Sequence, residues 1–337
     1  MKKLLLSLFL VITGLTISAQ EPNGYYDETE GLTGAALKNA LHNIIDDHDT
    51  YGYDDLEDQL KHTDEDPNNS NNVILLYTGR SQSKSSYGGG ADDWNKEHVW
   101  AKSHGDFGTT APAGSDMHHL RPTDASVNSS RGNKHFAEGG TQHSEATGCY
   151  YTDDTWEPRD AVKGDVARMI FYMATRYEGG NGEPDLEVVD YIPSDDAAPL
   201  HGVLSDLLAW NEQDPPDDFE RTRNNVIYGY QGNRNPYIDH PEWVCLVFGS
   251  DCPTAVNEIS NDFSIYPNPA ENMVNIEISN VFSATTIKII DITGKVVFET
   301  DKAMSLNAID VSGFKTGVYL VEVRNEVSVE RQKLIIK

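Results

Sequence analysis

The pattern of apolar residues changes near residue 263, and this change constrains the fold more than any other feature. Before it, apolar residues recur at helical spacing, for example over residues 34–48 and 159–177, and each segment predicts an amphipathic helix. After it, short runs alternate with period two between turns, as antiparallel strands do. A chain of 337 residues also exceeds what one hydrophobic core usually serves. We expect an α+β domain followed by a small all-β sandwich.

Other elements of the first domain follow from the same patterns. The apolar run 73–77 predicts a buried strand, and the Ser/Gly-rich stretch 81–93 predicts a loop. Two further helices are expected, around residues 203–210 and 219–227, on either side of the pair Pro215-Pro216.

The N-terminus predicts export. A basic start is followed by an apolar run over residues 4–17 and by the small residues Ser18 and Ala19, the order found in a signal peptide. A buried N-terminal helix fits this order less well, and no later stretch approaches the roughly 18–20 apolar residues of a membrane span. The expected organisation is a signal peptide (1–19), a first domain (20–253), a linker (254–262) and a second domain (263–337).

Three cysteines, Cys149, Cys245 and Cys252, suggest a disulfide in an exported protein. Cys245 and Cys252 are close in sequence and would leave Cys149 over, but the sequence alone does not choose the pairing. The absence of a C-x-x-C motif argues against a cysteine-based zinc site.

The net charge of −28 opposes long-range attraction of a polyanion. The acidity is unevenly placed, however, because residues 80–134 contain seven Lys and Arg against six acidic residues. Binding of a polyanion at that segment would depend on local contacts and on a divalent cation.

Residues 94–100 and 115–133 concentrate the side chains that carry chemistry. The first segment holds the pair Glu97-His98, and the second holds Asn128. His98 can act as a general base because the ordinary pKa of histidine is near neutral. Glu97 and Asn128 offer oxygen ligands that suit a hard cation. A base beside such a cation meets the needs of phosphodiester hydrolysis.

Taken singly, these signals are weak. Glu-His pairs are common, Asn128 could be an ordinary helix-surface residue, and we expect at least one of His118 and His119 to bond a backbone carbonyl. Locally, residues 118–121 predict a short strand, followed by a helix that begins at Pro122-Thr123 with Thr123 as its N-cap. Asn128 would then face the strand that bears Glu97 and His98.

Taken together, these segments resemble the bacterial endonuclease I family, over about residues 70–245. The resemblance implies a nuclease domain with a ββα-metal core, which cleaves DNA, with RNA as an alternative substrate, and leaves 5′ phosphates. The matching motifs are E-H-V (97–99), S-D-M-H-x-L-x-P (115–122), V-N-x-x-R-G-N (127–133), K-G-D-V-A-R-M-I-F-Y-M (163–173), L-x-A-W-N (207–211) and Q-G-N-R-N-P-Y-I (231–238).

The resemblance also implies roles for individual residues. His98 corresponds to the general base, and Glu97 and Asn128 to the ligands of Mg²⁺, with Ca²⁺ or Mn²⁺ as alternatives. Family members place an arginine near the scissile phosphate, but the corresponding loop, residues 101–114, contains none. The candidate replacements, all from this sequence, are Arg131 and Arg121 as catalytic cations and Lys102 and Lys134 as substrate-binding residues.

The last 75 or so residues, 263–337, resemble the type A C-terminal sorting domain of type IX secretion systems. The matching pieces are Y-P-N-P, D-I-T-G-K and K-T-G-V-Y-L-V-E-V. The resemblance implies the secretion machinery as a partner and a secreted or surface-attached protein. A carbohydrate-binding or adhesive module is the alternative for this domain.

Two other functions remain open at this point for the whole chain. Another secreted hydrolase is disfavoured because no H-E-x-x-H and no G-x-S-x-G motif occurs. A surface or adhesion protein without catalysis is favoured only by the acidic composition and the sorting tail.

Overall fold

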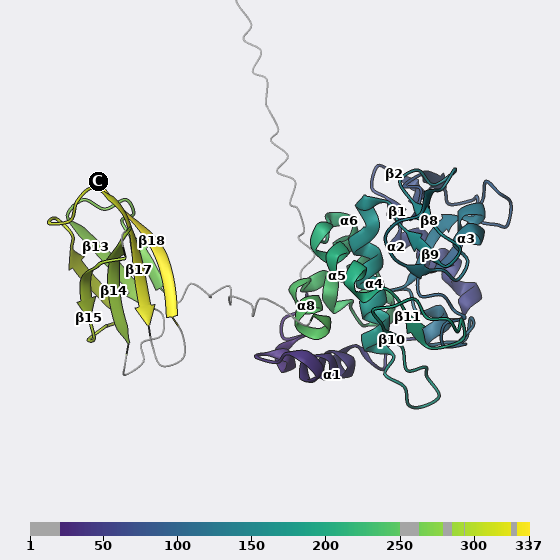
Figure 1. The fold of residues 1–337 in the computed structure, drawn as a ribbon, viewed down its shortest axis with the longest axis horizontal. Helices are drawn as coiled ribbons and strands as arrows, with labels where there is room; N and C mark the ends of the chain where they lie inside the picture. Colours follow the sequence, from purple (N-terminus) through teal and green to yellow (C-terminus); the bar gives the residue numbers. More distant parts are fainter. Residues whose placement is uncertain (1–20, 250–262, 279–284, 293, 325–328) are drawn as a thin grey trace, which may run out of the picture. The chain divides into compact units, whose positions relative to one another are not determined.

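A computed structural model describes residues 21–249, 263–278, 285–292, 294–324 and 329–337 (Figure 1). The chain divides into two compact units, Met1–Cys252 and Pro253–Lys337. Each unit is described by itself. The expected signal peptide (1–19) and linker (254–262) lie outside the described residues.

The described part of the first unit is mixed α and β. The helices expected over 34–48, 159–177, 203–210 and 219–227 are found as α1, α4, α5 and α6. Its α-helices are α1 (Gly34–Ile45), α2 (Leu56–Thr63), α3 (Ala125–Arg131), α4 (Lys163–Arg176), α5 (Leu204–Gln213), α6 (Asp218–Gln231), α7 (Pro236–Asp239) and α8 (Glu242–Phe248). Short 3₁₀ turns are η1 (Asp27–Thr29), η2 (Tyr53–Asp55), η3 (Ala113–Ser115) and η4 (Asp160–Val162).

The strands of the first unit are short and form small sheets, in the orders β1-β2-β3, β4-β5, β6-β9-β8-β7 and β10-β11. They are β1 (Glu65–Asp66), β2 (Asn69–Ile74), β3 (Ser81–Ser83), β4 (Trp94–His98), β5 (Leu120–Asp124), β6 (His135–Phe136), β7 (Thr141–Gln142), β8 (Tyr150–Tyr151), β9 (Thr155–Glu157), β10 (Glu187–Val188) and β11 (Leu200–His201).

The strand predicted over 73–77 ends at Ile74, because the chain turns there and the amide of Leu76 bonds the carbonyl of Pro122 at 2.9 Å. The stretch 81–93 is mostly loop, as expected, but its first three residues pair with β2 as β3. Both differences come from pairing across the sheet, which local composition does not encode.

Helix α4 forms the centre of the first unit. All of its residues are buried, and it packs against α1, α5 and α7. Figure 1 shows it between the helices α5 and α6 and the strand-rich part of the unit. An amphipathic helix would expose its polar face to solvent, but the polar face of α4 is buried. That face is paired instead: Arg168 binds Glu220 at 2.5 Å, and Arg176 binds Glu183 at 2.8 Å.

A buried ion network joins α2, β5, α4 and α6 behind the sheet. Asp64 accepts a hydrogen bond from Arg121 at 2.5 Å and another from Arg223 at 3.2 Å. Arg121 also donates to Asp165 of α4 at 3.1 Å. All of these side chains are buried, so each charge depends on its partners for compensation.

The ββα arrangement expected from the sequence is present. Strand β4 pairs antiparallel with β5, so that Glu97 lies opposite Arg121 and His98 opposite Leu120, and α3 follows directly. Strand β5 begins at Leu120, two residues after the predicted start at His118, and it runs on to Asp124 because Asn95 pairs with Thr123 and Trp94 with Asp124. Thr123 is consequently a strand residue and not the N-cap, and the helix begins at Ala125.

The second unit is a sandwich of two antiparallel sheets, in the orders β12-β13-β16 and β15-β14-β17-β18. Alternate residues of β13 and β14 point into its own apolar core. Strands β12 and β16 were not anticipated. The strands are β12 (Phe263–Tyr266), β13 (Met273–Ile278), β14 (Thr286–Asp291), β15 (Val296–Thr300), β16 (Leu306–Asp310), β17 (Gly317–Arg324) and β18 (Val329–Ile336).

The cysteines divide into two states. Cys149 is a free, buried thiol, whereas Cys245 is disulfide-bonded. Cys252 lies outside the described residues. Among the described helices, none has the length and apolar character needed to cross a membrane.

Replacing Asp64 with Asn should destabilise the first unit by about 3–5 kcal/mol, because Arg121 and Arg223 lose the carboxylate that compensates their buried charges. All five tryptophans lie in residues 94–243, so urea unfolding followed by tryptophan fluorescence reports on this unit alone. Lys61→Ala, which breaks only surface pairs on α2, is the control and should cost about 1 kcal/mol or less. An equally small loss for Asp64→Asn would contradict the role of the network.

Candidate active site

Glu97 lies near the end of β4, with its carboxylate buried. Oε1 accepts a hydrogen bond from the Tyr77 hydroxyl at 2.7 Å and lies 3.2 Å from Nη1 of Arg131. Burial raises the pKa of Glu97, and the Arg131 charge and the Tyr77 hydroxyl oppose that rise. Oε2 has no hydrogen-bond partner among the described residues, so one carboxylate oxygen is held and the other is available to a ligand.

Asn128 projects from α3 toward the same strand. Its amide nitrogen donates to Oδ1 of Asn95 at 2.7 Å and to the carbonyl of Lys96 at 3.2 Å. The amide group is thereby oriented, and within the described parts of the chain its oxygen accepts no hydrogen bond. Asn95 and Glu97 share one face of β4 because successive side chains alternate. The structure thus brings Glu97 and Asn128 to the same side of the strand, facing α3.

His98 projects from the opposite face of β4. Its ring stacks on Tyr53 at a centroid distance of 5.3 Å, and Nε2 lies 3.0 Å from the carbonyl oxygen of Gly114. A carbonyl can only accept, so Nε2 carries the proton and Nδ1 of the neutral ring keeps a lone pair. Burial and then the neighbouring His119 hold the pKa of His98 well below its ordinary value of 6.5. The ring is therefore neutral at neutral pH.

Nδ1 of His98 differs from its counterparts in the adjacent histidines. Nδ1 of His118 and of His119 is enclosed without a hydrogen-bond partner, whereas Nδ1 of His98 is not among these enclosed atoms. Within the described structure, the ring of His98 makes no hydrogen bond with the side chain of Glu97 or of Asn128. The connection between them is Arg131, whose Nη1 donates to the His98 carbonyl at 2.9 Å and contacts Glu97.

The positions of Arg121 and Arg131 contradict the catalytic role that the sequence predicted for them. Arg121 is 1% exposed and is held between Asp64 and Asp165. Arg131 is 0% exposed, and its guanidinium donates to the carbonyls of His98 and Val99 at 2.9 and 2.7 Å. Neither guanidinium can reach a phosphate group without leaving these bonds. Arg131 instead positions β4, and Arg121 belongs to the ion network.

The two lysines differ from the arginines. Lys102 is exposed, and its charge contributes to lowering the pKa of His98, which places it near the imidazole. Lys134 is partly buried and donates to the carbonyl of Ser130 at 3.0 Å. Lys102 therefore keeps a free ammonium group near the candidate base.

The expectation for the neighbouring histidines is confirmed for both. Nε2 of His118 lies 3.3 Å from the carbonyl of Asn233, and Nε2 of His119 lies 2.9 Å from that of Ala113. Asn233 and Asn235 are buried and bond to backbone carbonyls of Ile45 and Arg168. The two asparagines thus tie the segment after α6 to α1 and α4.

Two tyrosines that support the site were not anticipated. Tyr77 orients Glu97, and Tyr53 packs against His98 while its ring also receives the ammonium group of Lys96 at 3.9 Å from its centroid. Tyr77 was part of an apolar run and Tyr53 of an acidic stretch, so neither carried a local signal.

The antiparallel pair β4-β5, which bears Glu97 and His98, is followed directly by α3, which bears Asn128. The chain belongs to the Endonuclease I family, whose sequence model matches residues 33–242. A second model, the secretion system C-terminal sorting domain, matches residues 264–337. The protein is therefore a nuclease that is secreted or held at the cell surface, and the non-enzymatic alternative is excluded.

Curated relatives include both kinds of nuclease. An extracellular ribonuclease of Bacillus subtilis (strain 168) is 60% identical over 220 residues, which cover 65% of this chain and 76% of that protein. An extracellular ribonuclease of Bacillus amyloliquefaciens gives the same figures. An extracellular deoxyribonuclease of Aeromonas hydrophila is 31% identical over 130 residues, which cover 37% of this chain and 49% of that protein.

Acid should destabilise the first unit through its buried neutral histidines. Burial lowers the pKa of His118 and of His119 from 6.5 to about 4. Between these values the unfolded chain binds protons that the folded chain does not, so the free energy of unfolding falls as pH drops. These two groups contribute no pH dependence above about pH 6.5. Urea midpoints measured from pH 7 to pH 5 by tryptophan fluorescence should decrease accordingly.

The variant His119→Gln provides the control for this effect. A glutamine amide can still donate to the carbonyl of Ala113 but does not titrate, so the fall in stability with pH should become shallower. An unchanged slope in this variant would show that His119 does not carry the effect.

Proposed function

We propose that this protein is a metal-dependent endonuclease that hydrolyses phosphodiester bonds of both DNA and RNA, with His98 as general base and Glu97 and Asn128 as ligands of Mg²⁺. The observation that supports it best is the state of His98, whose bond to the Gly114 carbonyl leaves Nδ1 with a free lone pair. A neutral imidazole that is held in place and keeps a free lone pair is suited to removing a proton from water.

The donor set fits a hard cation. Oε2 of Glu97 and Oδ1 of Asn128 lie on the side of β4 that faces α3, while the other polar atoms of both groups are occupied. Such second contacts orient metal ligands in proteins. Two protein oxygens leave the remaining positions to water and phosphate oxygens, as Mg²⁺ prefers; Ca²⁺ and Mn²⁺ are the alternatives.

In the proposed reaction, Nδ1 of His98 takes a proton from water as the water oxygen attacks phosphorus. The bond from phosphorus to the 3′ oxygen breaks, the 3′ oxygen takes a proton from solvent water, and the products are a 5′ phosphate and a 3′ hydroxyl. A bound Mg²⁺ would offset charge on the phosphate and the leaving oxygen. Gly114 and Tyr53 hold the imidazole in place, and Tyr77 and Arg131 hold Glu97.

Lys102 is the proposed phosphate-binding residue, because its ammonium group is exposed beside His98. Lys134, whose ammonium group donates to the carbonyl of Ser130, is the second candidate. Contacts of this kind reach the backbone and not the base edges, so little sequence preference is expected. Acceptance of both nucleic acids is supported by relatives named as ribonucleases and as a deoxyribonuclease.

The second unit is proposed to engage the type IX secretion machinery. Its match to a sorting-domain model supports this role, and its separate core allows it to fold as a unit of its own.

Replacing His98 with Ala should lower cleavage of closed circular plasmid DNA and of an RNA transcript by about 100- to 10,000-fold, the usual contribution of a general base. His62→Ala removes an exposed histidine of α2 and should leave both activities unchanged. Tryptophan fluorescence of both variants establishes that they are folded. Wild-type cleavage by folded His98→Ala would remove His98 from the mechanism.

Removing the metal should abolish cleavage, and Glu97→Ala should raise the Mg²⁺ concentration needed for half-maximal activity by about 10-fold or more, because one of two protein ligands is lost. Initial rates titrated with Mg²⁺ after treatment with EDTA provide the measurement. Activity that persists in excess EDTA would eliminate the proposed metal dependence.

A further inference from the structure

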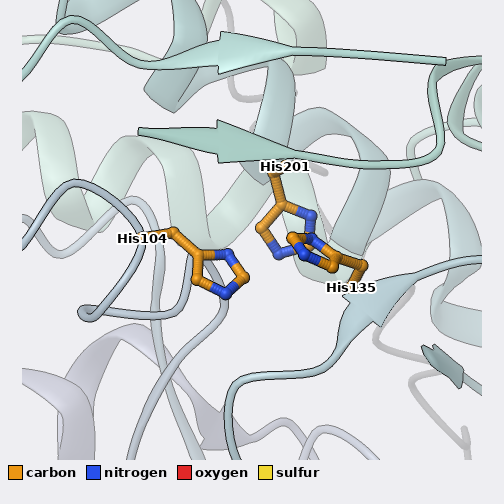
Figure 2. Close-up of side chains that lie close together, drawn as sticks. All are labelled: His104, His135 and His201. Atoms are coloured by element: carbon orange, nitrogen blue, oxygen red, sulfur yellow. The ribbon is translucent and has the colours of Figure 1, made fainter. Parts of the chain in front are cut away.

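Three buried histidines of the first unit lie close together, next to Arg131. His104 lies in the segment after β4, His135 in β6 and His201 in β11. One ring nitrogen from each lies within 4.8 Å of the other two, and Figure 2 shows the three rings grouped around one point. None of them belongs to the candidate active site.

The rings are enclosed and have few partners. The three residues are 0%, 3% and 0% exposed. Both nitrogens of His104 and Nε2 of His135 are buried and have no partner within hydrogen-bond distance in the described structure, although the nearby backbone of Asn133 and of Pro193 raises the pKa of these two rings. Nδ1 of His135 accepts a hydrogen bond from the amide of Gly202 at 3.4 Å. A buried polar atom without a partner destabilises a fold, so several of them close together call for an explanation.

His201 is oriented as a metal-binding histidine usually is. Its Nδ1 lies 3.0 Å from the carbonyl of Gly202, to which it donates, and this leaves the lone pair on Nε2. That lone pair accepts a long hydrogen bond from Nη2 of Arg131 at 3.5 Å, which a metal ion would displace. Burial is the largest cause that lowers the pKa of all three histidines. The rings are consequently neutral, which is the state that binds metals.

The charges around the cluster partly oppose a cation. Arg131 approaches Nε2 of His201 at 3.5 Å, and its charge lowers the pKa of the cluster. Its positive charge is itself paired with Glu97. On the other side, the carboxylate of Asp196 favours the charged forms of His104 and His135, and this negative charge would also favour a bound cation.

We propose that His104, His135 and His201 form a second metal site, which takes Zn²⁺ or a similar transition-metal ion and serves the structure, not catalysis. Three imidazoles suit zinc, copper, nickel or cobalt and not Mg²⁺ or Ca²⁺. Zn–N bonds of 2.0–2.1 Å place tetrahedral ligands roughly 3.4 Å apart, so the rings would move together on binding. Their enclosure keeps a nucleic acid strand away from the ion.

Such an ion would fasten the chain that leaves β4. The ring of Trp100 lies 5.2 Å from that of His201, and its Nε1 donates to the carbonyl of His104 at 2.9 Å. The site would therefore join the segment after β4 to β6 and β11, next to the guanidinium that holds Glu97. Loss of the ion would destabilise the first unit without touching the proposed Mg²⁺ ligands.

The test is the metal content of the full-length protein, purified without a histidine tag or a chelator and equilibrated with Zn²⁺. Plasma mass spectrometry after gel filtration should find one zinc ion per chain. Cobalt substitution should give the visible absorption of a tetrahedral site. Removal with dipicolinate should shift Tm downward by about 5 °C or more. Less than one ion in five chains would overturn the proposal even if no variant folds.

Variants locate the ion. His104→Gln and His135→Gln should each lose the bound zinc, whereas His143→Gln should retain it. His143 is a matched control because it is also buried but both of its nitrogens have partners. Retention of zinc by folded His104→Gln would overturn the assignment. Glu97→Ala should keep the zinc, so failure of the proposed Mg²⁺ site and failure of this site are distinguishable.

Discussion

The buried guanidinium of Arg131 is the contact on which the arrangement of the site depends. It closes α3 and binds the carbonyls of His98 and Val99, the carboxylate of Glu97 and the edge of His201. A carboxylate as buried as that of Glu97 is costly unless it is paired and hydrogen-bonded. Arg131 and Tyr77 meet that condition with one oxygen and leave the other available. The side chain of Arg131 thus fixes the end of β4 and compensates the buried negative charge of Glu97.

The same principle operates behind the sheet. Buried charges also occur where an amphipathic pattern predicts apolar contacts, namely at Asp64, Arg121 and Arg223. Helix α4 is buried on all sides, and its Asp165 pairs with Arg121 in the same network. Arg223 also donates to the carbonyls of Met117 and Leu120 at 2.6 Å, which holds the chain between η3 and β5. The segment that contacts His98 through Gly114 is therefore supported from the interior, and the imidazole of His98 is held in place.

The sequence predicts the elements better than the roles of the charged residues. Periodicity locates α1, α4, α5 and α6, and the motif order locates the ββα arrangement, because both are local patterns. It places the N-cap of α3 at Thr123, one residue before the observed N-cap Asp124, since pairing of Thr123 with Asn95 overrides the capping preference. Arg121 and Arg131 were misassigned because an arginine that binds carbonyls and one that binds phosphate look alike in sequence. The grouping of His104, His135 and His201 requires the tertiary fold.

Few basic side chains in this strongly acidic protein are available to a polyanion near the candidate site. Within residues 80–134, five of the seven basic side chains are engaged: Arg80 with Asp124, Lys84 with Glu65, Lys96 with Tyr53, Arg121 with Asp64 and Arg131 with Glu97. Lys102 and Lys134 have no acidic partner among the described residues. Two ammonium groups offer little compensation for a polyanion approaching a protein of net charge −28. A divalent ion between Glu97 and Asn128, as proposed, would supply positive charge that the described residues 80–134 do not provide.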